Sequence, residues 1–520
     1  MKKLPIGYST IDKLVDDDCI YVDKTKFVYE LVNNGSYYFL SRPQQFGKSV
    51  LVDTLKQAFL GNKALFKGLY LENNWDWETK YPVIHISFAG GTPYTEHTSW
   101  LINTIKIILE YNAKEYGLAI RGNSYSENFQ NLIIDLSKKY QQKVVILIDE
   151  YDKPVINIIE NIELAKISRN ILLGLYSVIK DLDQYLKFAF LTGVSNFSRA
   201  GIFSGLNNLY DITLDKRYAD ICGYTQDELE KYFNQYINDG KVDLVKLKKW
   251  YNGYNFMGND SQKVYNPFNI LLFFSNQYVY NNYWIETTAS TFLINLFEKN
   301  KYFIPEILEN AIVDSTTLGA FDLDNIPILG LLFQTGYLTI KEVTSIGIHL
   351  AYVINYPNLQ VKIALNDSLA EIGSNSDNKS NKLFRLAQIL DNNELDQLGQ
   401  LFASYFASIP NNWYANNDMD HYEGFYASVV YSFLCALGYD LIAEDTTNSG
   451  RIDLTLKMPD KIIIIEFKLS KYGNSKDALK QIKDKGYPDK YIKDNLPIYL
   501  IGISFNPQTR NLEDYALEQI

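Results

Sequence analysis

The sequence is poor in the residues that build thiolate and imidazole metal sites. Its 520 residues include three cysteines and four histidines, and both kinds are scattered along the chain. Their scarcity argues against a zinc site made of cysteines and against a histidine-rich metal site. An odd number of dispersed cysteines also fits a reducing compartment, so we expect a cytoplasmic protein.

Long apolar runs are missing as well. No stretch approaches the about 18 apolar residues of a membrane span, and no apolar segment follows Met1-Lys2-Lys3 as it would in a signal peptide. We therefore expect no membrane partner. An apolar content of 47% and a charged content of 21% are those of a folded soluble protein. At 520 residues the chain is too long for one ordinary core, and we expect roughly two to four domains.

The net charge of −11 opposes broad, sequence-independent binding to nucleic acid. The balance is uneven, because eight lysines and three aspartates fall between Lys468 and Lys493. Such a basic segment suits a phosphate-bearing substrate, and it suits equally well a helix face that lysines keep soluble.

The first 220 or so residues alternate strand-like and helix-like stretches, which predicts an α/β domain with a parallel sheet. The apolar spacing from Ser49 to Leu60 predicts a helix. The predicted strands are Tyr37 to Leu40, Val83 to Phe88, Val144 to Ile148 and Phe188 to Leu191.

The middle of the chain is mostly helical in pattern. Thr225 to Glu228 has the form of a helix start, and Gly336 to Ile340 with Ala351 to Ile354 predicts a small hairpin. The polar, serine- and asparagine-rich stretch from Glu371 to Lys382 is the best linker candidate.

A phosphate-binding loop is predicted after the first strand. Gly47-Lys48-Ser49 matches the end of a Walker A loop and opens the Ser49 helix, so backbone N–H groups and the helix dipole would face a phosphate. Lys48 would reach the β- and γ-phosphates, and the Ser49 hydroxyl would bind Mg²⁺. The match is incomplete, because Arg42 stands where the pattern has its first glycine.

A second element supports nucleotide binding. The apolar run from Val144 to Ile148 ends in Asp149 and Glu150, the Walker B form. Asp149 would hold Mg²⁺ through water, and Glu150 would polarise the attacking water. Many buried strands end in an acid, but the two motifs in this order within an α/β pattern favour ATP as a ligand.

The strand that ends at Leu191 is followed by Thr192 and Ser195 and then by Arg199. In ATPases of the AAA type, which this arrangement resembles, such a strand end places a polar side chain beside the γ-phosphate. The resemblance implies this role for Thr192 or Ser195. Arg199 is either a γ-phosphate contact or arginine finger, or a plain surface arginine.

A charged β-hairpin is predicted near the C-terminus. Two apolar runs, Ile452 to Leu456 and Ile462 to Phe467, flank a turn at Pro459-Asp460. A symmetric turn places Asp453 directly opposite Glu466, with Cβ atoms about 4.5–5.5 Å apart.

Lys468 shares the face of Glu466, because side chains alternate along a strand. Carboxylate oxygens suit Mg²⁺ or Mn²⁺, and the ammonium would orient a water or steady a phosphate charge. The alternative to a metal site is a solvent-exposed hairpin face on which charges happen to alternate. Four consecutive isoleucines before Glu466 oppose it, because they predict a strand buried on both sides.

This hairpin resembles the PD-(D/E)XK nuclease superfamily. The resemblance implies that Asp453 and Glu466 bind metal, that Lys468 is the catalytic lysine and that Glu423, on a preceding helix, assists. Glu423 shares the inward face of an amphipathic stripe with Tyr426 and Val430. Gln481, on the helix that should follow the hairpin, is the weakest of these assignments.

Along most of its length the chain resembles a bacterial family of predicted AAA-ATPase-like proteins, which join an N-terminal P-loop domain to a C-terminal PD-(D/E)XK domain. An arginine-proline loop start is typical of that family, which accounts for Arg42. The family commonly has arginines where this chain has Gln44 and Gln45, which puts affinity and turnover in question. The matching stretches are Tyr21 to Thr25, Arg42-Pro43 with Phe46 to Ser49, Ile148 to Asp152, Phe203 to Leu209, Trp250 to Tyr254, Tyr265 to Phe268, Gln334 to Thr339 and Tyr356 to Asn358.

We therefore expect an α/β protein of three parts: a P-loop NTPase (AAA-like) domain in residues 1–220, a helical lid and winged-helix-like segment in 221–375, and a PD-(D/E)XK nuclease-like domain in 376–520. The resemblance implies ATP hydrolysis with Mg²⁺ (or Mn²⁺) coupled to metal-dependent cleavage of nucleic acid. Two alternatives stay open: a nucleotide-operated switch whose C-terminal domain only binds nucleic acid or a partner, and a scaffold that binds nucleotide without hydrolysing it. AAA-type relatives often form rings, so an oligomer is an open expectation.

Overall fold

The computed structural model describes residues 1–90, 99–196, 208–284, 310–319, 323, 326–371, 376–407 and 423–520. The chain forms two compact units. The first comprises Met1–Asn281 with Ile312–Asn358, and the second is built around Leu359–Ile520. The expected first part and most of the expected middle part therefore fall in one unit.

The first unit is organised by a five-stranded sheet of order β2-β3-β4-β1-β5, in which every neighbouring pair is parallel. The four strands predicted from apolar runs are all confirmed. Strand β3 is buried along its whole length, as expected for a central parallel strand. The strands are β1 (Tyr37–Ser41), β2 (Val83–Ser87), β3 (Val144–Asp149), β4 (Leu186–Gly193) and β5 (Tyr210–Asp211).

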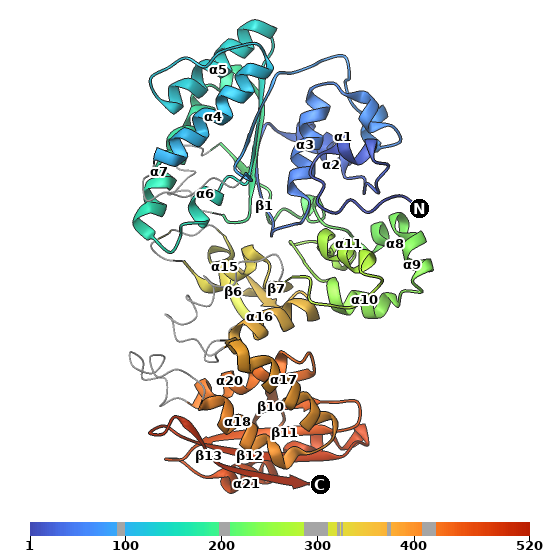
Figure 1. Ribbon diagram of the computed structural model, residues 1–520, viewed down its shortest axis with the longest axis vertical. Coiled ribbons are helices and arrows are strands. Elements are labelled where there is room, and N and C mark those ends of the chain that lie inside the picture. Colours follow the sequence, from blue (N-terminus) through green and yellow to red (C-terminus); the bar gives the residue numbers. More distant parts are fainter. Residues whose placement is uncertain are drawn as a thin grey trace. The chain divides into compact units, whose positions relative to one another are not determined.

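Helices cover both faces of this sheet (Figure 1). Helix α3 packs on β2, β3 and β4 from one side, and α4 and α5 pack on β2 and β3 from the other. Because β4 lies between β1 and β3, the ends of these three strands meet at one edge, where ligands bind in parallel α/β sheets. The helices are α1 (Ile11–Asp16), α2 (Thr25–Asn34), α3 (Lys48–Phe59), α4 (Ser99–Glu115), α5 (Tyr125–Tyr140), α6 (Lys153–Ile156) and α7 (Ile162–Asp181).

A group of short helices follows: α8 (Gln226–Tyr232), α9 (Asn234–Asp239), α10 (Leu244–Tyr251) and α11 (Pro267–Ser275). The predicted helix start at Thr225 is confirmed, because Thr225 and Glu228 form a capping box.

Further along the chain, α14 (Ser315–Leu318) and α15 (Ile328–Thr335) accompany a three-stranded sheet of order β6-β8-β7. The predicted hairpin is confirmed and longer than expected, with β7 (Thr339–Ile346) antiparallel to β8 (His349–Asn355) and β6 (Ala311–Asp314) beside β8. Gly336 belongs instead to the end of α15, because its φ of 88° makes the left-handed C-cap.

The second unit contains a mixed sheet of order β13-β12-β11-β10-β9. Strands β10 and β11 form the predicted hairpin in the predicted register, with Leu454 opposite Ile465 and Lys457 opposite Ile462. The isoleucine run is buried on both faces, since Ile463 and Ile465 join one core cluster and Ile462 and Ile464 join another. The strands are β9 (Asp440–Thr446), β10 (Arg451–Lys457), β11 (Ile462–Leu469), β12 (Ile498–Asn506) and β13 (Asn511–Gln519).

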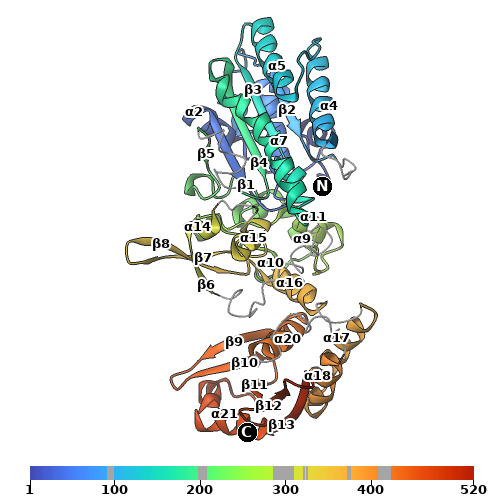
Figure 2. The ribbon, with the colours of Figure 1, turned by 90° about the vertical axis from the view of Figure 1, so that its left-hand side faces the viewer.

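Helices lie on both faces of this sheet too (Figure 2). Helix α21 (Ser475–Asp484) packs on β11, β12 and β13, and its Leu479 and Ile482 join the cluster of Ile462 and Ile464. Residues from α17 (Ser376–Asp391), α18 (Leu398–Phe406) and α20 (Glu423–Cys435) join the cluster on the other face. Helix α16 (Leu359–Glu371) packs against α20.

The linker expected from Glu371 to Lys382 is wrong for most of its length, because Ser376 to Lys382 form the first turns of α17. That helix is held by its later residues Leu386, Ile389 and Leu390, which are buried in the core. A polar start on a helix that packs only through its second half looks like a loop in sequence. The first unit ends at Asn358, before the boundary expected near residue 375.

Candidate functional site

The loop after β1 has the form that a phosphate site requires. Gly47, with a φ of 93°, is the N-cap of α3, and the helix begins at Lys48. The buried Lys48 ammonium lies within the loop and donates to the carbonyl oxygens of Arg42, at 3.1 Å, and Pro43, at 2.9 Å. These partners are neutral, so the positive charge stays available to an anion.

Arg42 does not face the phosphate position. Its guanidinium is fully buried and donates to the carbonyl oxygens of Ser41, Thr213 and Tyr218, and it lies 3.9 Å from the ring centre of Phe256. Burial lowers the pKa of Arg42 to about 10. Arg42 therefore anchors the base of the loop, which explains how an arginine can stand in place of a glycine there.

Asp149 and Glu150 stand at the end of β3, as predicted. Asp149 is buried, and its Oδ1 atom has no hydrogen-bond partner among the described residues. Burial raises the pKa of Asp149, and a hydrogen bond with Ser49 opposes this shift. Glu150 follows with a φ of 55°, a left-handed conformation that is uncommon for glutamate and turns the chain sharply after the strand.

One cavity of about 350 Å³ brings these elements together. Residues Gln45 to Leu51 and Glu150 line it on the phosphate-loop side. Gln44 is part of the same loop, and its carbonyl accepts a hydrogen bond from Asn266 at 3.2 Å. The remaining wall is mostly apolar and includes Tyr8, Ile20, Val22, Pro267, Phe268 and Leu271.

Thr192 and Ser195, the two candidates for a γ-phosphate contact at the end of β4, differ in whether the hydroxyl already has a hydrogen-bond partner. The Thr192 hydroxyl donates to the Leu40 carbonyl at 2.8 Å, so its proton is already used. The buried Ser195 hydroxyl has no hydrogen-bond partner within the described part of the chain. Ser195 is therefore the better donor for a phosphate. Arg199 lies outside the described residues.

Asp152 is a site residue that sequence reasoning missed. It is buried, and its carboxylate accepts from the backbone N–H groups of Val194 and Ser195. Burial, reinforced by the charge of Glu150, raises the pKa of Asp152 to about 6. The available signal was a third acid in Asp149-Glu150-Tyr151-Asp152, although nothing in the sequence shows which backbone groups it would bind.

The second candidate site lies on the hairpin. Asp453 Oδ2 accepts from the Phe467 N–H at 2.7 Å, so its side chain reaches over β11 beside Glu466. The Lys468 ammonium lies 3.8 Å from Glu466 Oε1. The structure thus brings Asp453, Glu466 and Lys468 together on one face.

Two further predicted residues approach this group from helices. Glu423, the first residue of α20, accepts from the Leu469 N–H at 3.2 Å at the end of β11. Gln481, on α21, donates from Nε2 to Glu466 Oε1. Gln481 was the weakest assignment from sequence, and in the structure it is a direct partner of Glu466.

The carboxyl groups of this site lie in an environment that disfavours negative charge. Burial raises the pKa values of Asp453, Glu466 and Glu423, and the mutual repulsion of these groups adds to the effect for Asp453 and Glu466. The Lys468 charge acts in the opposite direction on all three. Glu466 Oε2 is buried without a hydrogen-bond partner among the residues placed in the structure.

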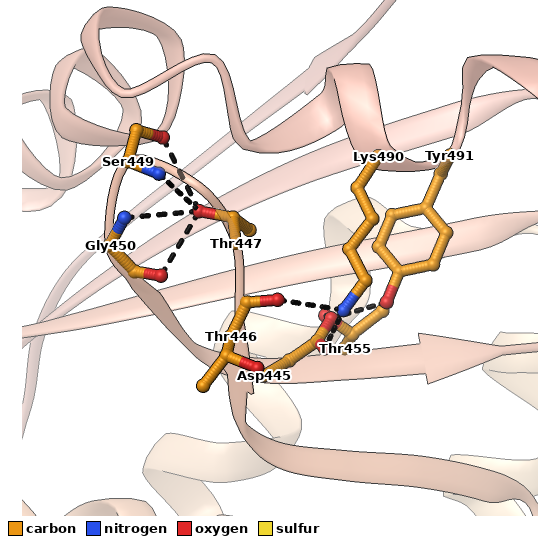
Figure 3. Close-up of polar contacts among 8 residues, drawn as sticks. All are labelled: Asp445, Thr446, Thr447, Ser449, Gly450, Thr455, Lys490 and Tyr491. Carbon is orange, nitrogen blue, oxygen red and sulfur yellow. Dashed lines mark hydrogen bonds and ion pairs between the residues drawn. The ribbon is translucent and has the colours of Figure 1, made fainter.

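A neighbouring buried carboxylate shows the contrasting, purely structural case (Figure 3). Asp445, on β9, accepts from the Thr455 hydroxyl at 2.9 Å and from Tyr491, and it pairs with Lys490. Both of its oxygens are therefore satisfied within the fold. The same view shows Thr447, Ser449 and Gly450 closing the turn that leads from β9 into β10.

The residues of the hairpin fit a divalent cation. In the parts of the chain with assigned positions, no group of three or more His, Cys, Asp or Glu side chains could hold a metal ion. Mg²⁺ commonly binds through one or two carboxylates together with water and substrate phosphates, so Asp453 and Glu466 suffice. The unsatisfied Glu466 oxygen and the raised pKa values are the features that a bound cation would relieve.

The basic segment after the hairpin is partly committed to structure. Lys483 pairs with Glu518 and Lys490 pairs with Asp445, and other lysines of the segment remain exposed. No described helix has the length and apolar character needed to cross a membrane.

The fold and these two sites define a chain with an ATPase-like domain and a nuclease-superfamily domain. The family described as "Predicted AAA-ATPase" matches residues 5–203, and the PD-(D/E)XK nuclease superfamily matches residues 421–515. The chain is 41% identical over 521 residues to a protein of Azotobacter chroococcum mcd 1 named "Uncharacterized protein in vnfD 5'region", with 100% of this chain and 99% of that protein covered. No solved structure matches the chain. The chain belongs to the family of predicted AAA-ATPases that carry a C-terminal PD-(D/E)XK domain.

Proposed function

We propose that the first unit binds and hydrolyses ATP. The observation that carries this proposal is a cavity lined by both the Lys48 loop and Glu150. Next to Glu150, at the end of β3, Asp149 Oδ1 has no hydrogen-bond partner in the described part of the chain. Lys48 holds the β- and γ-phosphates, Ser49 and Asp149 hold Mg²⁺, and Glu150 takes the proton of the attacking water. Ser195 rather than Thr192 donates to the γ-phosphate, and the apolar wall receives the base.

Calorimetry with ATP tests the binding role. Lys48→Ala should abolish ATP binding, because it removes the ammonium that lies inside the loop. Lys56→Ala is the matched control, since it removes the same charge from the same helix but does not line the cavity. Equal ATP affinity in Lys48→Ala and the parent would refute the assignment.

Turnover tests the second half of the proposal. Glu150→Gln keeps the shape of the side chain but cannot accept a proton, so ATP should bind and persist. We expect hydrolysis to slow by at least ~100-fold, the usual scale for a lost general base. A variant that hydrolyses ATP at the parental rate would exclude this role for Glu150. A parent without turnover would leave a nucleotide-binding scaffold.

We further propose that the second unit cleaves phosphodiester bonds in nucleic acid with Mg²⁺ or Mn²⁺. Asp453 and Glu466 would hold the cation, which when bound supplies Lewis acidity and a reactive water. Lys468 steadies charge that develops on the phosphate. Gln481 fixes one oxygen of Glu466 and leaves the other for the metal.

Incubation of the purified chain with plasmid DNA and with RNA, with and without Mn²⁺, tests this activity. Asp453→Asn and Lys468→Met should remove cleavage, and Asp460→Asn should retain it, because Asp460 lies exposed in the hairpin turn. Cleavage that persists in Asp453→Asn would refute the assignment of nuclease activity to this site.

A nucleotide-operated switch is the second candidate. The observation in its favour is that Glu423 does not complete a three-carboxylate metal group with Asp453 and Glu466 in the described structure. In this case ATP turns over and nucleic acid binds without being cut. In either case we propose that α8 to α11 form the helical lid and that α14 and α15 with β6 to β8 form the winged-helix-like segment.

A further inference from the structure

We propose that helix α15 forms part of the ATPase site, with Gln334 as a positioning residue for the loop Val194–Asn196 at the end of β4. The inference rests on the proposed ATPase function. It adds to it a residue far outside the matched ATPase segment, which ends at residue 203. In the sequence, Gln334 begins the family stretch Gln334 to Thr339, which by itself implies no role for it.

Three consecutive backbone N–H groups of this loop are bound by buried side chains. Val194 N and Ser195 N donate to Asp152 Oδ2, at 3.2 Å and 2.6 Å. Asn196 N donates to Gln334 Oε1 at 2.8 Å. Asp152, Ser195, Asn196 and Gln334 are all buried, so each missing bond would leave an unsatisfied group. The position of the loop is therefore fixed jointly by Asp152, which follows β3, and by Gln334 on α15.

This loop lies at the edge of the sheet where we propose that the nucleotide binds. Strand β4 separates β1, which leads into the phosphate loop, from β3, which ends at Asp149. The Ser41 hydroxyl donates to the Val194 carbonyl and joins the loop to the end of β1. Between the amides held by Asp152 and Gln334 stands the Ser195 hydroxyl, which has no hydrogen-bond partner among the residues that the structure describes. A shift of Asn196 would move that hydroxyl.

Gln334 is itself held at its other end. Its Nε2 atom donates to the carbonyl oxygens of Gly319, at 2.7 Å, and Leu318, at 3.3 Å, at the end of α14. The site therefore needs an acceptor toward Asn196 and a donor toward two carbonyls. A primary amide provides both, whereas an ionised carboxylate provides only the acceptor.

The neighbouring residue on α15, Phe333, packs against Phe256, an aromatic residue that supports the phosphate loop. The ring of Phe333 packs edge-on against the ring of Phe256, with the two ring centroids 6.4 Å apart. Phe256 in turn covers the Arg42 guanidinium at 3.9 Å and the Phe46 ring at 5.9 Å. Helix α15 thus contacts the end of β4 directly through Gln334 and reaches the phosphate loop indirectly, through the packing of Phe333 on Phe256. The chain then continues through β7 and β8 to Asn358, where the first unit ends.

Steady-state ATPase kinetics of the full chain test the proposal with Gln334→Ala, Gln334→Glu and the control Thr335→Val. Thr335 is next to Gln334, and among the described residues its hydroxyl bonds within its own helix alone, to the carbonyl oxygens of Leu331 at 2.7 Å and Leu332 at 3.4 Å. We expect Gln334→Ala to lower kcat by ~10- to 100-fold, the scale of a displaced catalytic group, with KM and ATP affinity within about 3-fold of the parent. Thr335→Val should keep the parental kcat.

Gln334→Glu gives a readout that a general loss of packing would not give. Its carboxylate keeps the bond to Asn196 N and faces two carbonyl oxygens, and protonation restores a donor toward them. We expect its kcat relative to the parent to rise as the pH falls, at constant ATP affinity. A parental kcat in Gln334→Ala, or a fall in ATP affinity that accounts for the whole loss, would overturn the positioning role while leaving the ATPase proposal intact. A parent without turnover would overturn both.

Discussion

Asp453 and Glu466 are two buried carboxyl groups that share one face of a hairpin. Burial raises the pKa of both, the charge of Glu423 adds to both shifts, and the charge of Asp453 adds to that of Glu466. A carboxyl whose pKa is raised in the folded state stabilises the fold below its unfolded pKa of about 4, and this contribution is lost as the pH rises through the folded value. Without metal, the second unit should therefore lose stability as the pH rises from acid toward neutral and beyond.

The Asp453→Asn variant tests whether the stability of the second unit changes with pH in this direction. The asparagine oxygen can still accept from the Phe467 N–H but does not titrate. In EDTA we expect the free energy of unfolding of the variant, relative to the parent, to rise by at least ~1 kcal/mol between about pH 5 and about pH 8, since one unit of pKa shift corresponds to about 1.4 kcal/mol.

Urea unfolding at both pH values measures the effect. The exposed Asp460→Asn should show the same difference from the parent at each pH. If the Asp453→Asn difference is also independent of pH, the raised pKa of Asp453 is excluded. Added Mn²⁺ should favour the parent over Asp453→Asn, because the cation takes the place of the proton.

At the level of single residues, sequence reasoning predicted the positions that follow from a local pattern. Lys48 lies in the loop before α3, Asp149 lies at the end of β3 and Asp453 lies beside Glu466, because loop, strand end and hairpin symmetry are all local. Sequence reasoning missed Asp152 and Gln334, whose partners are backbone groups far away in the sequence. Gln334 and Asn196 are 138 positions apart, and no periodicity indicates such a contact.

The same distinction holds for secondary-structure elements. The β10–β11 register followed from a symmetric turn, since Met458 N donates to the Lys461 carbonyl and closes it. The strand order of the first sheet could not be predicted from the sequence, because no local pattern indicates that β4 lies between β1 and β3. The linker predicted up to Lys382 overlaps the first turns of α17, because the start of that helix is polar and its apolar contacts come late.

The segment after Cys222 illustrates how one element supports another. Gly223 N donates to the Phe46 carbonyl at 3.0 Å, and both residues line the cavity beside the phosphate loop. Gly223 has a φ of 89°, and a Cβ there would lie 2.7 Å from the Val264 side chain and 3.1 Å from the Tyr265 carbonyl. The close approach of this turn to the 264–265 segment thus shapes the wall behind the phosphate loop.

Gly223→Ala should therefore destabilise the first unit and weaken ATP binding. Gly68→Ala is the matched control, because Gly68 has a similar φ of 79° but nothing within 4 Å of its added Cβ. Both variants carry the left-handed strain of about 1–2 kcal/mol, and overpacking against Val264 should add roughly 1–3 kcal/mol to Gly223→Ala alone. Chemical unfolding compares the two. Equal losses of unfolding free energy in the two variants would show that the Val264 side chain moves aside at no cost in stability.

At the scale of the whole molecule, the two proposed sites belong to different compact units. The second unit has core clusters on both faces of its own sheet, and the first is built on the buried strands β1 to β4. Substitutions without shared partners generally act additively. Binding at one site should therefore survive the loss of the other, whatever coupling operates during turnover.

Calorimetry with the two ligands on the full chain tests this independence. Lys48→Ala should lose ATP binding and keep the Mn²⁺ affinity of the hairpin within about 2-fold in nucleotide-free buffer, since neither its charge nor its packing reaches the second core. Asp453→Ala should lose Mn²⁺ binding and keep ATP affinity. Loss of both ligands in either variant would mean that the units fold as one cooperative body, and the sites would then have to be analysed as a single assembly.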